Sequence, residues 1–94
     1  MVRTLPGVLQ FIFEDPHASR VEIHGTGPDG RDRSWPMAPA ADGRWIASLR
    51  LDPEAEGRFD FRYLVDGRFW ALDEGVRTLV RDDRGHCRSR LGAC

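Results

Sequence analysis

A stretch in the second half of the chain alternates between side chains suited to a core and side chains that are mostly suited to solvent. Within residues 58–65, one face of an extended strand carries Phe59, Phe61, Tyr63 and Val65. The other face carries Arg58, Asp60, Arg62 and Leu64. This period of two predicts a half-buried β-strand and excludes an amphipathic helix over the same residues.

A strong turn signal follows this strand directly. Asp66-Gly67 suits a type I′ turn, which needs positive φ at both central residues and matches the twist of paired strands. The sequence therefore predicts a β-hairpin with Phe69 and Trp70 on its return arm. Because successive residues of a strand point to opposite faces, we expect one of these two rings to face inward and the other outward.

The rest of the chain also has period two, and none of it sustains a helical period. Further strands are expected at residues 9–13, 21–24, 44–51, 76–80 and 87–91, which makes about seven. Residues 25–42 contain three prolines and form the longest predicted irregular connection, with Trp35 inside it. This pattern predicts an all-β, immunoglobulin-like sandwich of antiparallel strands, formed by residues 1–94 as one domain.

Composition narrows the classes of partner. The chain has 14 basic and 15 acidic residues, a net charge of -1, which disfavours binding to nucleic acid. It has no apolar run long enough to cross a membrane and no clear signal peptide, so we expect a soluble, cytoplasmic protein. The two cysteines, Cys87 and Cys94, make no disulfide framework and are expected to be reduced.

Four segments in order resemble one family. They are VEIHG at 21–25, Trp35 with Met37 shortly after, DGRW at 42–45, and FDFRYLVDGRFWALD at 59–73. The series resembles carbohydrate-binding module family 48. That family includes the isoamylase N-terminal early set domain and the glycogen-binding domain of the AMP-activated protein kinase beta subunit. The resemblance covers residues 8–91, and its most specific element is FRYLVDGRFW followed by Asp73.

The resemblance implies a function and a set of residues. Family members that bind starch or glycogen use two exposed Trp rings and a basic side chain, which correspond here to Trp35, Trp70 and Arg62. Sugar rings present flat arrays of C–H groups that stack on aromatic faces, and an Arg fork can donate to their hydroxyls. The resemblance therefore implies a non-catalytic module that binds an α-glucan.

This chain departs from the family pattern after the last predicted turn. Where glycan-binding members place an Asn, this chain has Arg88, which can only donate hydrogen bonds. Arg84, His86 and Arg88 are expected on the rim of the site. The change keeps open an alternative, a protein-interaction or regulatory domain of the same fold that acts on a separate glycogen-metabolising enzyme or associates with itself.

The other two tryptophans have alternative interpretations. Trp45 shares a face with Ala47 and Leu49, so it is expected in the core. Trp35 lies in a polar stretch, which favours a binding role, although it could instead cap the sandwich.

The sequence gives little support for a catalytic site or a metal site. Asp73, Asp82 and Asp83 suggest the paired carboxylates of a glycosidase, yet acids at turns are expected for solvation alone. No His and Cys spacing suggests a metal site, and no phosphate-binding loop or nucleophile motif occurs. The sequence therefore predicts no enzyme, no cofactor and no metal.

Overall fold

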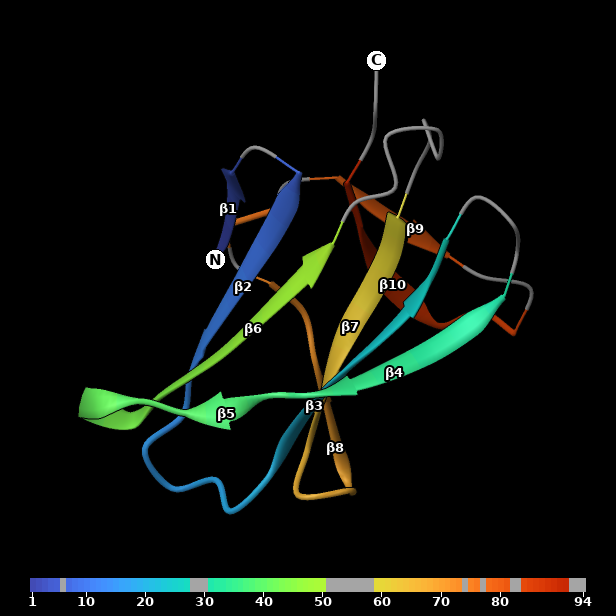
Figure 1. The fold of residues 1–94 in the computed structure, drawn as a ribbon. Helices are drawn as coiled ribbons and strands as arrows, with labels where there is room; N and C mark the ends of the chain where they lie inside the picture. The colour runs from blue at the N-terminus through green and yellow to red at the C-terminus, as the bar shows by residue number, and fades with distance from the viewer. Residues whose placement is uncertain are drawn as a thin grey trace.

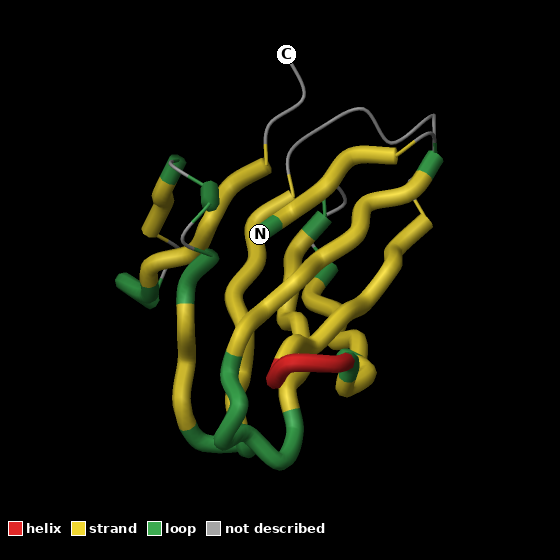
Figure 2. Tube along the Cα trace, turned by 90° about the vertical axis from the view of Figure 1, so that its left-hand side faces the viewer, coloured by secondary structure: helices red, strands yellow, loops and turns green. Residues whose placement is uncertain are grey.

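The computed structural model describes residues 1–5, 7–27, 31–50, 59–73, 75–76, 78–81 and 84–91. Ten strands lie in this part of the chain, arranged as two antiparallel sheets that form a sandwich. The one helical element among these residues is a short 3-10 turn, η1 (Ala41–Gly43), shown in red in Figure 2. The all-β prediction is confirmed, and the strand count is higher than predicted because the chain adds strands at its start and within residues 25–42.

The two sheets differ in size (Figure 1). The smaller sheet has the order β1 (Val2–Leu5), β2 (Val8–Glu14), β6 (Arg44–Arg50), β5 (Ala38–Pro39). The larger sheet has the order β4 (Asp32–Pro36), β3 (Val21–Thr26), β7 (Phe59–Val65), β10 (Cys87–Leu91), β9 (Leu79–Arg81). The short strand β8 (Phe69–Ala71) also pairs with β7.

The core lies between the sheets and is built from aromatic rings. Phe61 and Tyr63 of β7 are fully buried, as the alternating pattern predicted, and Phe11 of β2 meets the Phe61 ring edge-on at 4.9 Å. Trp45 is also buried, as predicted, and its indole N–H donates to the Asp15 carbonyl at 3.1 Å. Each buried ring removes a large apolar area from water, and Leu9, Val21, Ile23 and Met37 complete the core.

The prediction of an irregular connection over residues 25–42 is wrong. Residues 25 and 26 end β3, and two further strands, β4 and β5, follow. Figure 1 shows β4 running on into β5, so the chain passes from the larger sheet to the smaller one near Met37. Within the described residues β4 pairs only with β3, and β5 only with β6, so Pro36 and Pro39 lie on edge strands. An edge strand tolerates proline because its outer side needs no backbone donor.

The hairpin between β7 and β8 has the predicted turn. Asp66 and Gly67 have φ of 53° and 69°, and the N–H of Arg68 donates to the Val65 carbonyl at 3.0 Å. Val65 lies opposite Phe69, so three residues rather than two connect the strands. The Asp66 carboxylate also accepts the N–H groups of Ser19 and Arg20, at 2.7 and 2.9 Å. This aspartate therefore ties the hairpin to the loop before β3.

Asp73 anchors the chain beyond β8. Its side chain is buried, only 3% of the residue being exposed, and it accepts the Tyr63 hydroxyl at 2.5 Å and the Gly75 N–H at 2.8 Å. The Met1 amine also lies 2.7 Å from this carboxylate. Burial raises the pKa of Tyr63 far above its ordinary value, and the hydrogen bond and charge of Asp73 raise it further. Asp73 is thus a structural residue.

Candidate functional site

The outward face of the larger sheet brings together most of the predicted site residues. Arg62 lies opposite His24 of β3, and Leu64 lies opposite Trp70 of β8. Paired residues share a face of a sheet, and Phe61 and Tyr63, on either side of Arg62, point into the core. The side chains of Arg62, His24 and Trp70 therefore lie on the side away from the core.

Trp70 crosses this face and lies against Arg62. The guanidinium carbon of Arg62 is 3.6 Å from the centre of the Trp70 ring system. The His24 ring is 5.1 Å from the indole at an interplanar angle of 86°. Because β7 lies between β3 and β8, the indole has to extend across β7 to reach His24. The ring is therefore held over the sheet by two residues from neighbouring strands.

Exposure shows which member of this stack is outermost. Trp70 is 47% exposed, whereas Arg62 is half-buried and its Nε atom is shielded from solvent. The guanidinium thus lies under the indole, and the indole presents its other side to solvent. A cation–π contact of this kind contributes about 0.5–2 kcal/mol. It helps to hold a large aromatic ring in place at a surface position.

Phe69, the neighbour of Trp70, is 64% exposed. The strand pairing confirms the prediction that one of these two rings faces inward and the other outward, but the ring on the inward side is not buried. Phe69 pairs with Val65 and so lies on the core side of the sheet, but its position at the end of the hairpin leaves it uncovered. Figure 1 shows this hairpin at the lower end of the larger sheet.

His86, just before β10, and Cys87, its first residue, lie beside the stack of Arg62 and Trp70. His86 Nδ1 lies 3.3 Å from Arg62 Nη2. A depression of about 350 Å³ lies here, lined by Arg62, Trp70, His86 and Cys87 among others, and Cys87 is an exposed, free thiol. His86, which was predicted on the rim of the site, thus contacts Arg62, the residue beneath the indole.

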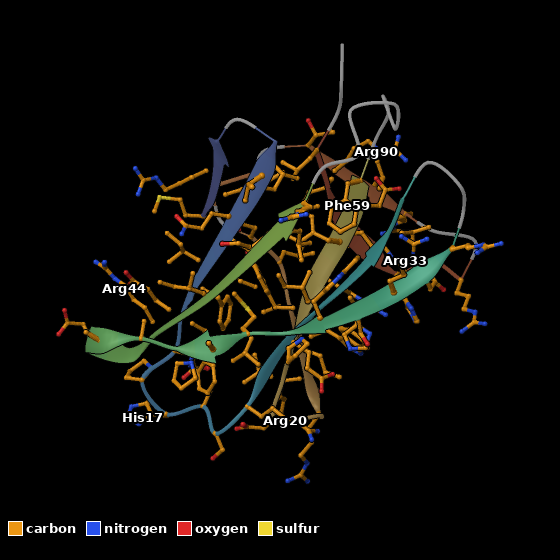
Figure 3. The ribbon with its side chains drawn as sticks, viewed as in Figure 1. His17, Arg20, Arg33, Arg44, Phe59 and Arg90 are labelled. Atoms are coloured by element: carbon orange, nitrogen blue, oxygen red, sulfur yellow. The ribbon has the colours of Figure 1, made fainter. Side chains whose placement is uncertain are left out.

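A second depression, of about 290 Å³, lies on the other side of Arg62. Its basic lining residues are Arg33, Arg62, Arg84 and Arg88. Arg88 is held in place, since its Nη1 donates to the Thr26 hydroxyl at 2.7 Å and only 16% of its side chain is exposed. Asp32 Oδ1 lies 3.8 Å from the same Nη1 atom. Figure 3 shows Arg33 on β4, on the opposite side of the view from Arg44.

Trp35 is placed away from this surface. It lies on β4 opposite Ile23, which is fully buried, so Trp35 shares the inward face. Its ring meets Phe59 at 5.7 Å and packs against the core. The prediction that Trp35 lies in a loop is wrong, and the structure groups Arg62, Trp70, Arg84, His86 and Arg88 without it. Figure 3 shows Phe59 near the start of β7.

The prediction omitted five residues that line this second depression: His24, Gly25, Asp32, Arg33 and Ser34. His24 was detectable, because it alternates with Ile23 and pairing β3 with β7 places it beside Arg62. Arg33 and Ser34 were not detectable, because residues 25–42 were expected to have no strand to orient them.

A larger depression of about 730 Å³ lies outside this face. It is lined by Phe13, Tyr63 and Asp73 among others, so it borders the core and the Asp73 network. Among the described residues, no three His, Cys, Asp or Glu side chains gather where a metal ion could bind. No helix in that part of the chain is long and apolar enough to cross a membrane.

Comparisons with known proteins give the fold a context. No family model matches the sequence, and no curated protein matches it significantly. A pullulanase from Anoxybacillus sp. LM18-11, solved with maltotetraose, has a TM-score of 0.73 and 17% identity, over 94% of this chain and 13% of that chain. A type I pullulanase from Bacillus subtilis str. 168, solved with maltose, has a TM-score of 0.69 and 13% identity, over 94% of this chain and 12% of that chain.

The catalytic module of the glycogen-degrading pneumococcal virulence factor SpuA also matches, with a TM-score of 0.69 and 14% identity. That match covers 88% of this chain and 14% of the other. The chain thus spans only 12–14% of the length of these proteins. At this level of identity the likeness establishes a shared fold, one that forms a small part of pullulanases and of a glycogen-degrading protein.

Proposed function

We propose that the protein is a non-catalytic module that binds α-glucans of the glycogen or starch type, of the carbohydrate-binding module family 48 kind. The observation that carries the proposal is the Trp70 indole, 47% exposed and supported from beneath by Arg62 at 3.6 Å. The shared fold with part of a pullulanase solved with maltotetraose supports it. The proposal includes a cytoplasmic location, because a free thiol such as that of Cys87 is typical of a reducing compartment.

The stack suggests how the site works. A pyranose ring presents C–H groups to the exposed side of the indole, while His24 and His86 lie near enough to reach its hydroxyls. Arg62 acts as a positioning residue, since it holds the indole flat across β7 rather than reaching the sugar itself. An open surface with one ring platform has few hydrogen bonds, so binding in the micromolar to millimolar range is expected, about -4 to -8 kcal/mol.

Native affinity electrophoresis in gels with and without glycogen tests this proposal. We expect glycogen to retard the wild-type protein and to have no effect on Trp70→Ala. Phe69→Ala is the matched control, because it removes an exposed ring of similar size from the same hairpin and is expected to keep the retardation. Equal retardation of Trp70→Ala and the wild type, or none of the wild type, would contradict the proposal.

A second candidate function is a protein-interaction domain of the same fold that binds an enzyme or a second copy of itself. Phe69 favours it, because its ring is 64% exposed on the side of the hairpin away from Trp70. Light scattering after size exclusion tests self-association. A dimer that Phe69→Ser converts to a monomer would support this function, and a monomeric wild type would count against it.

A further inference from the structure

The depression beside Trp70 has more positive charge than a neutral sugar needs. Four arginines line it, and Asp32 is the one carboxylate among the described residues that do. A sugar hydroxyl both donates and accepts, so sites for neutral sugars combine amides, carboxylates and hydroxyls, whereas a guanidinium only donates. A lining dominated by donor-only cations is suited to an acceptor-only, anionic group.

The arrangement of the arginines also has an energetic cost. Ser89 of β10 lies opposite Phe61 of β7, so Arg88 and Arg62 are neighbours on the outward face. Like charges at neighbouring positions of a sheet destabilise it. Arg88 is nevertheless mostly buried and fixed by the Thr26 hydroxyl at 2.7 Å. Asp32 lies 3.8 Å from Arg88 but its side chain is 79% exposed, so a ligand that carries negative charge would stabilise the neighbouring arginines further.

We propose that this depression is an anion subsite that binds a phosphate monoester on the glucan, so that the ligand is a phosphorylated α-glucan. The inference rests on the proposed function, because the subsite shares Arg62 and Trp70 with the sugar platform. A phosphate bound in this subsite is carried by the sugar that stacks on Trp70 or by the next sugar of the glucan chain. Each guanidinium has five N–H donors, so an arginine that already contacts a protein group keeps donors for a phosphate oxygen.

A pair of matched polymers tests the subsite. The probes are an amylopectin that carries phosphate monoesters and the same polymer after phosphatase treatment, cast in native gels at equal concentration. We expect the apparent Kd of the wild type to be roughly tenfold lower for the phosphorylated polymer, and this preference to weaken as ionic strength rises. Arg88→Gln and Arg84→Gln are expected to reduce the preference, and the double variant to remove it.

Arg44→Gln is the control for net charge, because it makes the same change on the smaller sheet and is expected to keep the preference. Equal retardation by the two polymers would overturn the subsite and leave the proposed function standing, whereas no retardation by either would overturn both. A preference that survives in the double variant would also overturn the subsite.

Competition in solution identifies the source of the phosphate. Glucose 6-phosphate, inorganic phosphate and AMP are compared at equal concentration for displacement of the protein from the phosphorylated polymer. The proposal expects the sugar phosphate to be the strongest competitor. Equal displacement by inorganic phosphate would overturn it in favour of a free-anion site. Stronger displacement by AMP would overturn it in favour of a nucleotide whose base stacks on Trp70.

Discussion

The two faces of strand β7 carry side chains with opposite surroundings. Phe61 and Tyr63 point inward and are fully buried, while Arg62, between them in sequence, points outward under the Trp70 indole. The inward rings touch only protein, whereas the outward stack leaves an aromatic ring in solvent. One strand therefore stabilises the sandwich with one set of residues and builds a candidate ligand surface with the other.

This division gives substitutions on the two faces different effects. An inward substitution removes apolar area or a buried hydrogen bond, so it lowers the free energy of unfolding. An outward substitution removes a surface contact, so it is expected to change the proposed binding with little change in stability. The predictions below test this separation.

The largest effect is expected for Phe61→Ala. The ring is fully buried and lies 4.9 Å from Phe11, so truncation leaves a cavity between the sheets. Loss of a buried Phe costs about 3–5 kcal/mol, a large part of the total stability of a small domain. Urea unfolding followed by Trp fluorescence measures the change. A loss below about 1 kcal/mol would contradict the assignment of this face as the core.

The second largest loss of stability is expected for Gly25→Ala, near the end of β3. A Cβ at this position would overlap the ring of Phe59, which packs between Trp35 and Phe61. Overpacking of this kind costs about 1–3 kcal/mol. Thermal unfolding of Gly25→Ala, of Phe59→Leu and of the double variant provides the measurement. The double variant is expected to lose less than the sum of the two single variants, and strict additivity would show that the two positions do not interact.

The fold was mostly predictable, and the exceptions have physical reasons. The alternation and the turn at Asp66-Gly67 are local signals, and the structure confirms the turn and the alternation over residues 59–65, residue 58 lying outside the described residues. The strand β4 was missed because its proline and charged residues are typical of a loop, although an edge strand tolerates both. That error also misplaced Trp35, since only the pairing with Ile23 shows that it faces inward.

Tyr63→Phe is expected to lose about as much stability as Gly25→Ala, through the loss of a single hydrogen bond. This change removes the hydroxyl that donates to Asp73 at 2.5 Å and leaves a buried carboxylate with one donor fewer. We expect the free energy of unfolding to fall by about 1–3 kcal/mol. The ring itself remains, so Tyr63→Phe is expected to lose less stability than Phe61→Ala.

The pH dependence of Tyr63→Phe provides a second test. Burial and the contact with Asp73 raise the pKa of Tyr63 in the folded state above its value of about 10 in the unfolded chain. This stabilisation is fully present below about pH 10 and is lost as pH rises above it, because the unfolded state deprotonates first. Urea unfolding from pH 8 to 11 is expected to show a steeper loss for the wild type than for Tyr63→Phe. Equal slopes would contradict the role of this hydroxyl.

The candidate site was less predictable than the fold. Alternation places Arg62 on the outward face, and the family resemblance selects Trp70, but neither shows that one lies over the other. That contact depends on the indole reaching across β7 from β8, which follows from three-dimensional pairing rather than from spacing in the chain. The role of Arg62 beneath the ring was missed for this reason.

The smallest loss of stability is expected for Trp70→Ala. The same variant is expected to lose the most binding to glycogen. The ring is 47% exposed and its main contact in the fold is the stack on Arg62, so its loss costs about 0.5–1 kcal/mol. Urea unfolding of this variant beside Phe61→Ala compares two aromatic truncations that differ in the face they occupy. A loss for Trp70→Ala as large as that for Phe61→Ala would show that the outward ring is part of the core. A small loss of stability together with lost retention on glycogen would show that binding and folding can be changed separately on one strand pair.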